Sequence, residues 1–298
     1  MADVSAAETA MIIEALTHQR IVAHVDVFIT ALLVCEIIIN LPVEIEHIWM
    51  KRWSYLTVLY IIQRYLPFFD TAVMVLNLHF GENLSTRDCT LNYNISAWCF
   101  IVGIVLSEIL LTLRVWAVWQ RSLPVAIGLS VFFFACWVPC YVLFAQSLSA
   151  AVFATLPLPN FRGCLIANGD HIIFLWWVLM MVYDTGILVA ILIPGVAAYR
   201  RGGRSELVRT VYHDGVIYYA LIFLVSTINV IVTLALPPDL VLLLTSFERV
   251  LHSILTSRSI LHIRQIGAKV LARQHGGGNL HEAIALPFST KQPQTNSI

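Results

Sequence analysis

The chain has 298 residues, of which 59% are hydrophobic and only 12% are charged, and its formal net charge at neutral pH is zero. Soluble domains carry about 25% charged residues, so this composition excludes an ordinary soluble protein. The balanced charge also gives no reason to expect a nucleic-acid partner, because binding to nucleic acids depends on basic surfaces. The expected partner of most of the chain is therefore a lipid bilayer.

Long apolar segments separated by short polar connectors run through the chain. A helix needs ~20 apolar residues to cross a ~30 Å hydrocarbon core, and a backbone in lipid must satisfy its own hydrogen bonds, so helices are expected. The seven segments cover residues 21–43, 55–79, 95–119, 123–147, 171–199, 212–236 and 239–263. The sequence predicts an all-α integral membrane bundle of seven helices over residues 21–263.

The two ends of the chain differ from this bundle. Residues 1–20 are predicted to be an extracellular N-terminal segment. Between 264 and 274, apolar residues alternate with Arg264, Lys269 and Arg273, which is typical of a short amphipathic helix lying on the inner leaflet. Residues 275–298 are polar and contain proline, so a disordered cytosolic tail is expected there.

Lysine and arginine in the short connectors predict the orientation, because these residues are enriched on the cytosolic side. One side of the bundle holds only Arg20, Arg87 and Arg162. The other side holds eleven basic residues: Lys51, Arg52, Arg121, Arg200, Arg201, Arg204, Arg209, Arg264, Lys269, Arg273 and Lys291. We expect the N-terminus outside and the C-terminus in the cytosol, in the plasma membrane rather than an internal membrane.

The connectors assigned to the outside contain two further features. Asn83 and Asn94 each begin an N-glycosylation sequon. Cys89 and Cys164 lie in two different outside connectors, where oxidation is permitted, so they are candidates for a disulfide. The alternative is two unpaired thiols. The remaining four cysteines fall inside the predicted helices, where packing explains them.

Several ionisable residues fall near the middle of the predicted helices. Such groups are costly in hydrocarbon and usually face the interior of a bundle. They could pair internally and hold helices together, or they could line a polar cavity that accepts a proton, a metal cation or an amine-bearing ligand. The candidate cavity residues are Glu36, Arg64, Glu108, Asp184, Glu248, Arg249 and His252. Glu248 and His252 are four apart and share a helix face, either as a titrating pair or as a packing pair.

Arg114 and Asp214 fall at the cytosolic ends of the third and sixth predicted helices. A salt bridge between them would form an inner lock whose opening releases the sixth helix. Arg114 could equally bind lipid phosphate, and Asp214 could pair with Arg209 or Arg258. A separation of Arg114 and Asp214 above ~10 Å, about one helix diameter, would exclude the lock.

Sequence patterns that carry enzyme chemistry are absent. The chain has no phosphate-binding glycine loop, no HExxH zinc motif and no GxSxG nucleophile elbow. No lysine lies within the predicted helices, which excludes a retinal Schiff base. We therefore predict no catalytic residue, no cofactor and no dedicated metal site, and a protein that is not an enzyme.

Six spaced elements resemble a basidiomycete fungal family of seven-helix membrane proteins catalogued as a domain of unknown function. They are Arg64-Tyr65-Leu66-Pro67 with Asp70, Glu44 ahead of Trp49 and Trp53, Glu108 with Arg114, Asp214-Gly215 with Tyr218-Tyr219, His252-Ser253-Ile254-Leu255, and Arg258 with Arg264. The resemblance covers roughly residues 25–264. His213 departs from it, because an arginine often precedes the Asp-Gly pair in that family. The resemblance implies seven helices and a membrane location, but no ligand and no reaction.

The leading functional hypothesis is a receptor-like protein that senses an outside ligand or stimulus and alters its cytosolic face, where an unidentified partner could bind. The likeness to G-protein-coupled receptors is architectural only, because neither a DRY-type triplet nor an NPxxY sequence is present. The alternative is a transporter or proton-coupled carrier that uses the mid-membrane acids. A third hypothesis is a lipid-modifying membrane enzyme.

Overall fold

The computed structural model describes residues 6–81, 84–150, 152–154, 164–168, 173–200, 206–235, 240 and 243–276. Within this described part, the helices form seven rods. Three rods at the N-terminal side are α1 (Ala6–Glu44) continued by the π-helix η1 (Ile45–Trp49), then α2 (Tyr55–Pro67) with η2 (Phe68–Val75) and α3 (Leu76–Phe80), then α4 (Thr86–Val118). The other four are α5 (Leu123–Ala150), α6 (Ile173–Arg200), α7 (Glu206–Ala235) and α8 (Thr245–Gly276).

Six helices of the described residues are long and apolar enough to cross a membrane, which makes the protein a multi-pass membrane protein. They correspond to the first six predicted segments. The seventh rod, α8, is equally long but more polar. Its polar side chains are buried against other helices, among them Ser246, Glu248, Arg249, His252, Ser253, Thr256, Ser257 and Ser259.

The helix boundaries follow from local chemistry. Ser54 caps α2 by accepting a hydrogen bond from the Thr57 amide at 3.3 Å, and Ser85 with Asp88 forms a reciprocal capping box at the start of α4. Pro67 has no amide hydrogen to donate, and the regular α-helix gives way to η2 directly after it. Gln120 and Arg121 adopt φ of 53° and 56°, which closes the short turn between α4 and α5.

Two helices extend beyond the segments predicted for them. The first helix begins at Ala6 rather than at residue 21, because alanine, glutamate and leucine between 6 and 16 favour helix without an apolar run. The amphipathic helix predicted over 264–274 is not separate, since these residues continue α8 to Gly276 without a break. No proline interrupts α8, and Gly267 alone does not end it. The tail from 277 onward lies outside the described residues.

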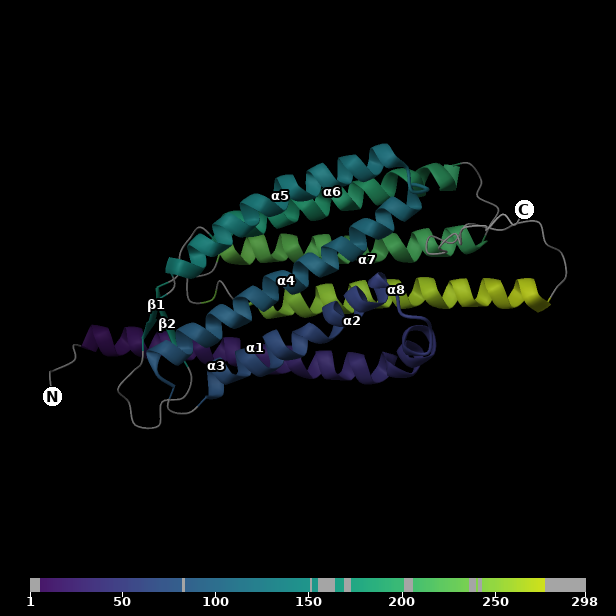
Figure 1. The fold of residues 1–298 in the computed structure, drawn as a ribbon. Coiled ribbons are helices and arrows are strands. Elements are labelled where there is room, and N and C mark those ends of the chain that lie inside the picture. The colour runs from purple at the N-terminus through teal and green to yellow at the C-terminus, as the bar shows by residue number, and fades with distance from the viewer. Residues whose placement is uncertain are drawn as a thin grey trace, which may run out of the picture.

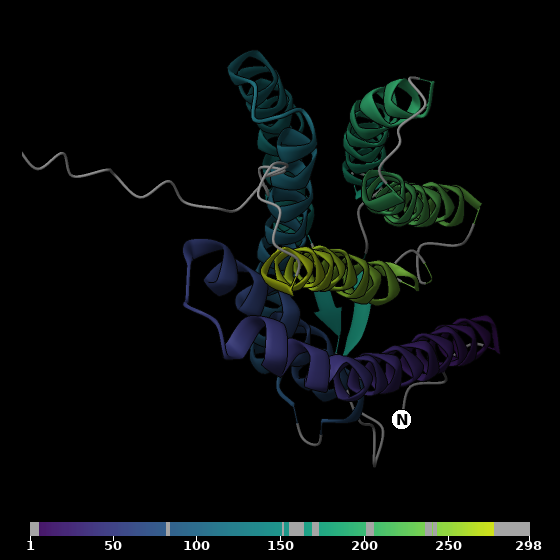
Figure 2. The same cartoon turned by 90° about the vertical axis from the view of Figure 1, so that its right-hand side faces the viewer.

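The rods lie roughly along one axis, so that α1 begins at one end of the bundle and α8 finishes at the other (Figure 1). Seen along this axis, α8 occupies the middle of the bundle (Figure 2). It packs against α1, α2, α4 and α7, while α6 packs between α5 and α7. This central place explains why a polar helix is stable here: neighbouring helices, rather than lipid, surround its polar side chains.

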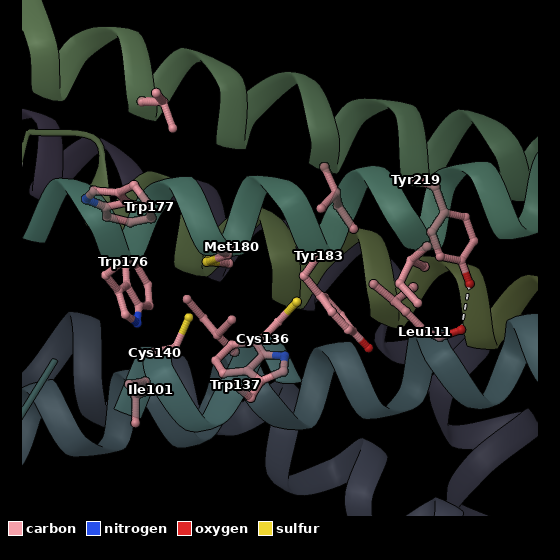
Figure 3. Packing of buried hydrophobic residues seen from close by; sticks show 14 of the residues in the cluster. Ile101, Leu111, Cys136, Trp137, Cys140, Trp176, Trp177, Met180, Tyr183 and Tyr219 are labelled. Carbon is pink, nitrogen blue, oxygen red and sulfur yellow. Dashed lines mark hydrogen bonds between the residues drawn. The ribbon is translucent and has the colours of Figure 1, made fainter. Parts of the chain in front are cut away.

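An aromatic core joins α4, α5, α6 and α7 (Figure 3). Trp176 and Trp177 of α6 contact each other edge to face with ring centroids 4.3 Å apart, and Tyr183 lies further along the same helix. The Tyr219 hydroxyl donates a hydrogen bond of 2.8 Å to the Leu111 carbonyl, which fixes α7 to α4 (Figure 3). Buried aromatic side chains of this size dominate packing energies.

A short hairpin covers one end of the bundle and is the exception to the predicted all-α class. Strand β1 (Val152–Ala154) pairs antiparallel with β2 (Leu165–Asn168) in the connector between α5 and α6. Cys164, just before β2, forms a disulfide with Cys89 near the start of α4. The Cys164 amide also donates to the Leu78 carbonyl of α3 at 2.8 Å, and Gln19 of α1 donates to the Cys164 carbonyl at 3.1 Å.

Candidate functional site

The seven residues expected to line one polar cavity do not form a single group. The structure separates them into three arginine–carboxylate pairs and one cluster around His252. Each arginine has a carboxylate partner of its own, so the internal-pairing interpretation describes Glu36, Arg64 and Arg249. Only Glu108, Asp184, Glu248 and His252 lie together as the cavity interpretation expects.

The first two pairs join α8 to α1 and α1 to α2. Arg258 donates two hydrogen bonds of 2.6 Å to the carboxylate of Glu36, and its side chain is 47% exposed. Arg64 donates from Nε to Glu44 Oε2 at 2.6 Å, and both side chains are buried. Tyr65 donates to the other oxygen of Glu44 at 3.0 Å. Both pairs are structural connections between neighbouring rods.

The third pair joins α8 to η2. Arg249 donates from Nε to Asp70 Oδ2 at 3.0 Å, and Thr71 donates to Asp70 Oδ1 at 2.8 Å. The guanidinium lies on the backbone of α4 at Gly103, where a Cβ atom would collide with it. Glycine is therefore required at this position for Arg249 to reach Asp70. Arg64 and Arg249 each have a carboxylate partner outside the cluster, so neither of these two arginines is paired with the acids around His252.

His252 of α8 lies among three carboxylates from three helices. Its Nδ1 is 3.1 Å from Glu108 Oε1 on α4, and its Nε2 is 3.7 Å from Glu248 Oε1 one turn earlier on α8. Asp184 of α6 completes the group, because Asp184, Glu248 and His252 each place a ligand atom within 4.8 Å of the other two. All four side chains are at most 4% exposed.

Two residues of α7 hold the carboxylates in place. The Ser226 hydroxyl contacts the carboxylates of Asp184 and Glu248; its oxygen is 2.8 Å from Glu248 Oε1 and closer still to Asp184 Oδ2. Asn229 donates from Nδ2 to Glu248 Oε2. The cluster therefore connects α4, α6, α7 and α8 through side chains buried in the membrane-spanning part of the bundle.

The charge of this cluster is unbalanced. Three carboxyl groups face one histidine, so full ionisation of the acids would leave a net negative charge even with His252 protonated. Burying uncompensated charge in low dielectric costs several kcal/mol or more, so such a group binds protons or a cation. The arrangement is suited chemically to holding a small positive species.

Sequence reasoning missed Ser226 and Asn229. They are three residues apart in an otherwise apolar stretch of α7, a spacing that places both on one helix face. That spacing was the available signal, but single serine and asparagine residues are common in membrane helices. Glu44 and Asp70 belong to the family pattern, and their pairing with Arg64 and Arg249 was not predicted.

The proposed inner lock is not tested, because the side chain of Asp214 lies outside the described residues. Arg114 donates from Nη1 to Ser259 of α8, and its guanidinium carbon is 6.0 Å from the Tyr219 ring centre. Arg258 is engaged by Glu36, so that alternative partner for Asp214 is occupied. Asn83 also lies outside the described residues, and Asn94 lies within α4.

Comparison with known families gives one match. Residues 26–69 match DUF6533, a family of unknown function. No curated protein matches the chain. The matched segment contains Glu36, Glu44 and Arg64, hence both halves of the pair that joins α1 to α2. The resemblance drawn over residues 25–264 is supported over this segment only, and neither a fungal source nor a helix count follows from it.

Proposed function

We propose that the protein is a receptor-like, non-enzymatic membrane protein whose seven helices all cross the bilayer. The observation that carries the proposal is the fixed connector between α5 and α6. A disulfide ties Cys164 to α4, and hydrogen bonds tie the same residue to α1 and α3. One end of the bundle therefore presents a surface held by a disulfide, whereas at the other end the turn between α1 and α2 is held by hydrogen bonds from Arg264 to His47 and Thr57.

The distribution of basic residues supports an orientation with the constrained end outside. Exposed Lys51 and Arg121 lie in connectors at the opposite end, and Lys269 lies near the end of α8 on that side. Lysine and arginine favour the cytosolic side, and disulfides favour an oxidising compartment. We propose the plasma membrane as the location, with a partner at the cytosolic end.

The His252 cluster supports a way in which a ligand at the disulfide end could affect helix positions at the opposite end of the bundle. Ser226 of α7 is hydrogen-bonded to Asp184 of α6 and Glu248 of α8, and Glu108 of α4, the helix that carries the disulfide, lies 3.1 Å from His252 of α8. Such a network has few satisfactory arrangements, because any partly satisfied arrangement leaves buried polar groups unpaired. A ligand that prefers one arrangement would shift the relative positions of these helices.

A ligand screen tests the proposal. Purified protein in lipid nanodiscs is screened for small molecules that raise its Tm. A second sample carries nitroxide labels at Gln120→Cys and Ile217→Cys in a Cys35→Ala background, so that the distance between the two labels can be measured. We expect a stabilising compound to change the distance between these labels by ~2 Å, the upper end of the helix shifts seen in allosteric transitions. The same compound should not accumulate in proteoliposomes. A stabilising compound that leaves the label distances unchanged would contradict the proposal.

A carrier is the second candidate, favoured by the excess of buried acids around His252. A carrier uses such acids to bind and release a proton or cation alternately on the two sides. It predicts accumulation of solute or movement of protons in proteoliposomes, abolished by Asp184→Asn. The disulfide and the hairpin argue for the receptor-like role, because an alternating carrier must also open that end.

A further inference from the structure

We infer that Asp184, Glu248 and His252 form a binding site for a divalent cation of the zinc type, bridging α6 and α8. The three side chains offer two carboxylate oxygens and one imidazole nitrogen within 4.8 Å of one another. Zinc bonds to such atoms are about 2.0 to 2.2 Å long, so small side-chain rotations bring all three to one ion. The inference does not depend on the receptor-like role.

The surroundings of His252 match those of a metal-binding histidine. Such histidines hold one ring nitrogen against a carboxylate while the other binds the metal, which fixes the ring and its tautomer. Here Glu108 lies 3.1 Å from Nδ1, and Nε2 is turned toward Glu248. Ser226 and Asn229 play the corresponding part for the carboxylates by donating to Asp184 and Glu248.

Several buried polar atoms of this cluster have no hydrogen-bond partner. Among the residues that the structure describes, Asp184 Oδ1, Asn229 Oδ1, Glu108 Oε1 and both ring nitrogens of His252 have no hydrogen-bond partner. All four residues are at most 4% exposed. Leaving several buried polar atoms unpaired at one place costs about 1–3 kcal/mol for each atom, and a cation at their centre removes that cost for the acceptors.

The donor set determines the class of cation. Calcium and magnesium prefer sites made entirely of oxygen, whereas imidazole with carboxylate suits zinc, manganese, iron or cobalt in the divalent state. A divalent charge offsets both ligand carboxylates, whereas Arg64 and Arg249 are paired with Glu44 and Asp70 instead. Three protein ligands leave at least one position open for water or for Asn229 Oδ1, as in zinc sites that are not purely structural.

The chain contains a matched control. His79 Nε2 lies 2.7 Å from Asp26 Oδ2 at the disulfide end, so the same two residue types meet there without a second carboxylate. Within the described part of the chain, the only group of three or more potential ligands is Asp184, Glu248 and His252. Variants of the His79–Asp26 pair remove a histidine or an aspartate without touching the proposed site.

Metal binding to the full chain tests the inference. The protein is purified without a histidine tag, stripped with a chelator, and titrated separately with Zn²⁺, Co²⁺, Mg²⁺ and Ca²⁺ while Tm and bound metal are measured. We expect one Zn²⁺ or Co²⁺ per chain and a Tm that rises with the logarithm of their concentration, and no such rise with Mg²⁺ or Ca²⁺. Absence of stoichiometric Zn²⁺ and Co²⁺ from the wild-type protein would overturn the inference.

Variants identify the ligands. Asp184→Asn, Glu248→Gln and His252→Gln should each abolish the bound metal and the Tm response, while Asp26→Asn and His79→Gln retain both. Glu108→Gln should raise the dissociation constant of the metal by ~10–100-fold without abolishing binding, because Glu108 positions the imidazole ring of His252. Retention of full binding by all three ligand variants would place the metal elsewhere and overturn the inference.

X-ray absorption of the wild-type Co²⁺ or Zn²⁺ complex keeps the test decisive if a ligand variant fails to fold. The expected first shell contains one imidazole nitrogen and carboxylate or water oxygens at ~2.0 to 2.2 Å. A shell with sulfur or with two or more imidazoles would assign the metal to other residues and contradict the inference.

Discussion

At the scale of single residues, Arg64, Arg249 and Arg258 each pair with one carboxylate, but their surroundings differ. The side chains of Arg64 and Glu44 are 2% and 0% exposed, whereas those of Arg258 and Glu36 are 47% and 7% exposed. The two pairs have the same shortest separation, 2.6 Å. Burial, rather than contact distance, therefore sets how much stability depends on each pair.

Glu44→Gln should destabilise the protein more than Glu36→Gln. Removing Glu44 leaves a buried arginine without its counter-charge, which costs about 3–5 kcal/mol. After Glu36→Gln, Arg258 can extend its long side chain toward water, so a loss of ~1 kcal/mol or less is expected. Unfolding in detergent followed by near-ultraviolet circular dichroism measures both. Equal losses would contradict the importance of burial.

Gly103 provides a second comparison at this scale. A methyl group at Gly103 collides with the guanidinium of Arg249, so Gly103→Ala must displace Arg249 from Asp70. We expect a loss of at least ~2 kcal/mol, from overpacking together with a broken buried pair. At Gly128 on α5, a Cβ atom would have no neighbour within 4 Å, so Gly128→Ala is the control. The control should be neutral or stabilise by up to ~1 kcal/mol, because alanine favours helix.

At the scale of the elements, the sequence predicted six rods well because their signal is a long apolar run. Hydropathy gives a weaker signal for α8, whose buried residues are largely polar and face other helices rather than lipid. The hairpin was not predicted, since its strands have only 3 and 4 residues. The division of the polar residues into separate pairs was not predicted either, because the depth of a residue in the membrane does not specify which neighbouring helix its side chain faces.

The disulfide offers a prediction about these elements. Cys89→Ser with Cys164→Ser should lower stability by between about 2 and 4 kcal/mol, because the bridge closes a long loop. The two cysteines are 75 residues apart in the chain. Cys35→Ala, which removes an exposed free cysteine, should have little effect and is the control. Limited proteolysis of the connector between α5 and α6 should accelerate in the double variant alone.

At the scale of the whole molecule, the number of crossings determines which residues share a side of the membrane. Six crossings would place the segments before α1 and after α8 on the same side, whereas seven place them on opposite sides. We propose seven crossings, because α8 has 32 residues, enough to cross a bilayer, and lies in the middle of the bundle (Figure 2). Its polar residues are compatible with a crossing because other helices cover them.

Single cysteines labelled with a membrane-impermeant maleimide test this count and the orientation together. In a Cys35→Ala background, Glu14→Cys lies on α1 at the disulfide end, Lys51→Cys in the connector after η1, and Lys269→Cys near the end of α8; all three positions are exposed. We expect Glu14→Cys to react in intact cells, and the other two to react only after permeabilisation. Reaction of Lys269→Cys together with Glu14→Cys in intact cells would mean that α8 does not cross. Reaction of Lys51→Cys and Lys269→Cys without Glu14→Cys would reverse the orientation, and the constrained hairpin would then face the cytosol, where no outside ligand reaches it.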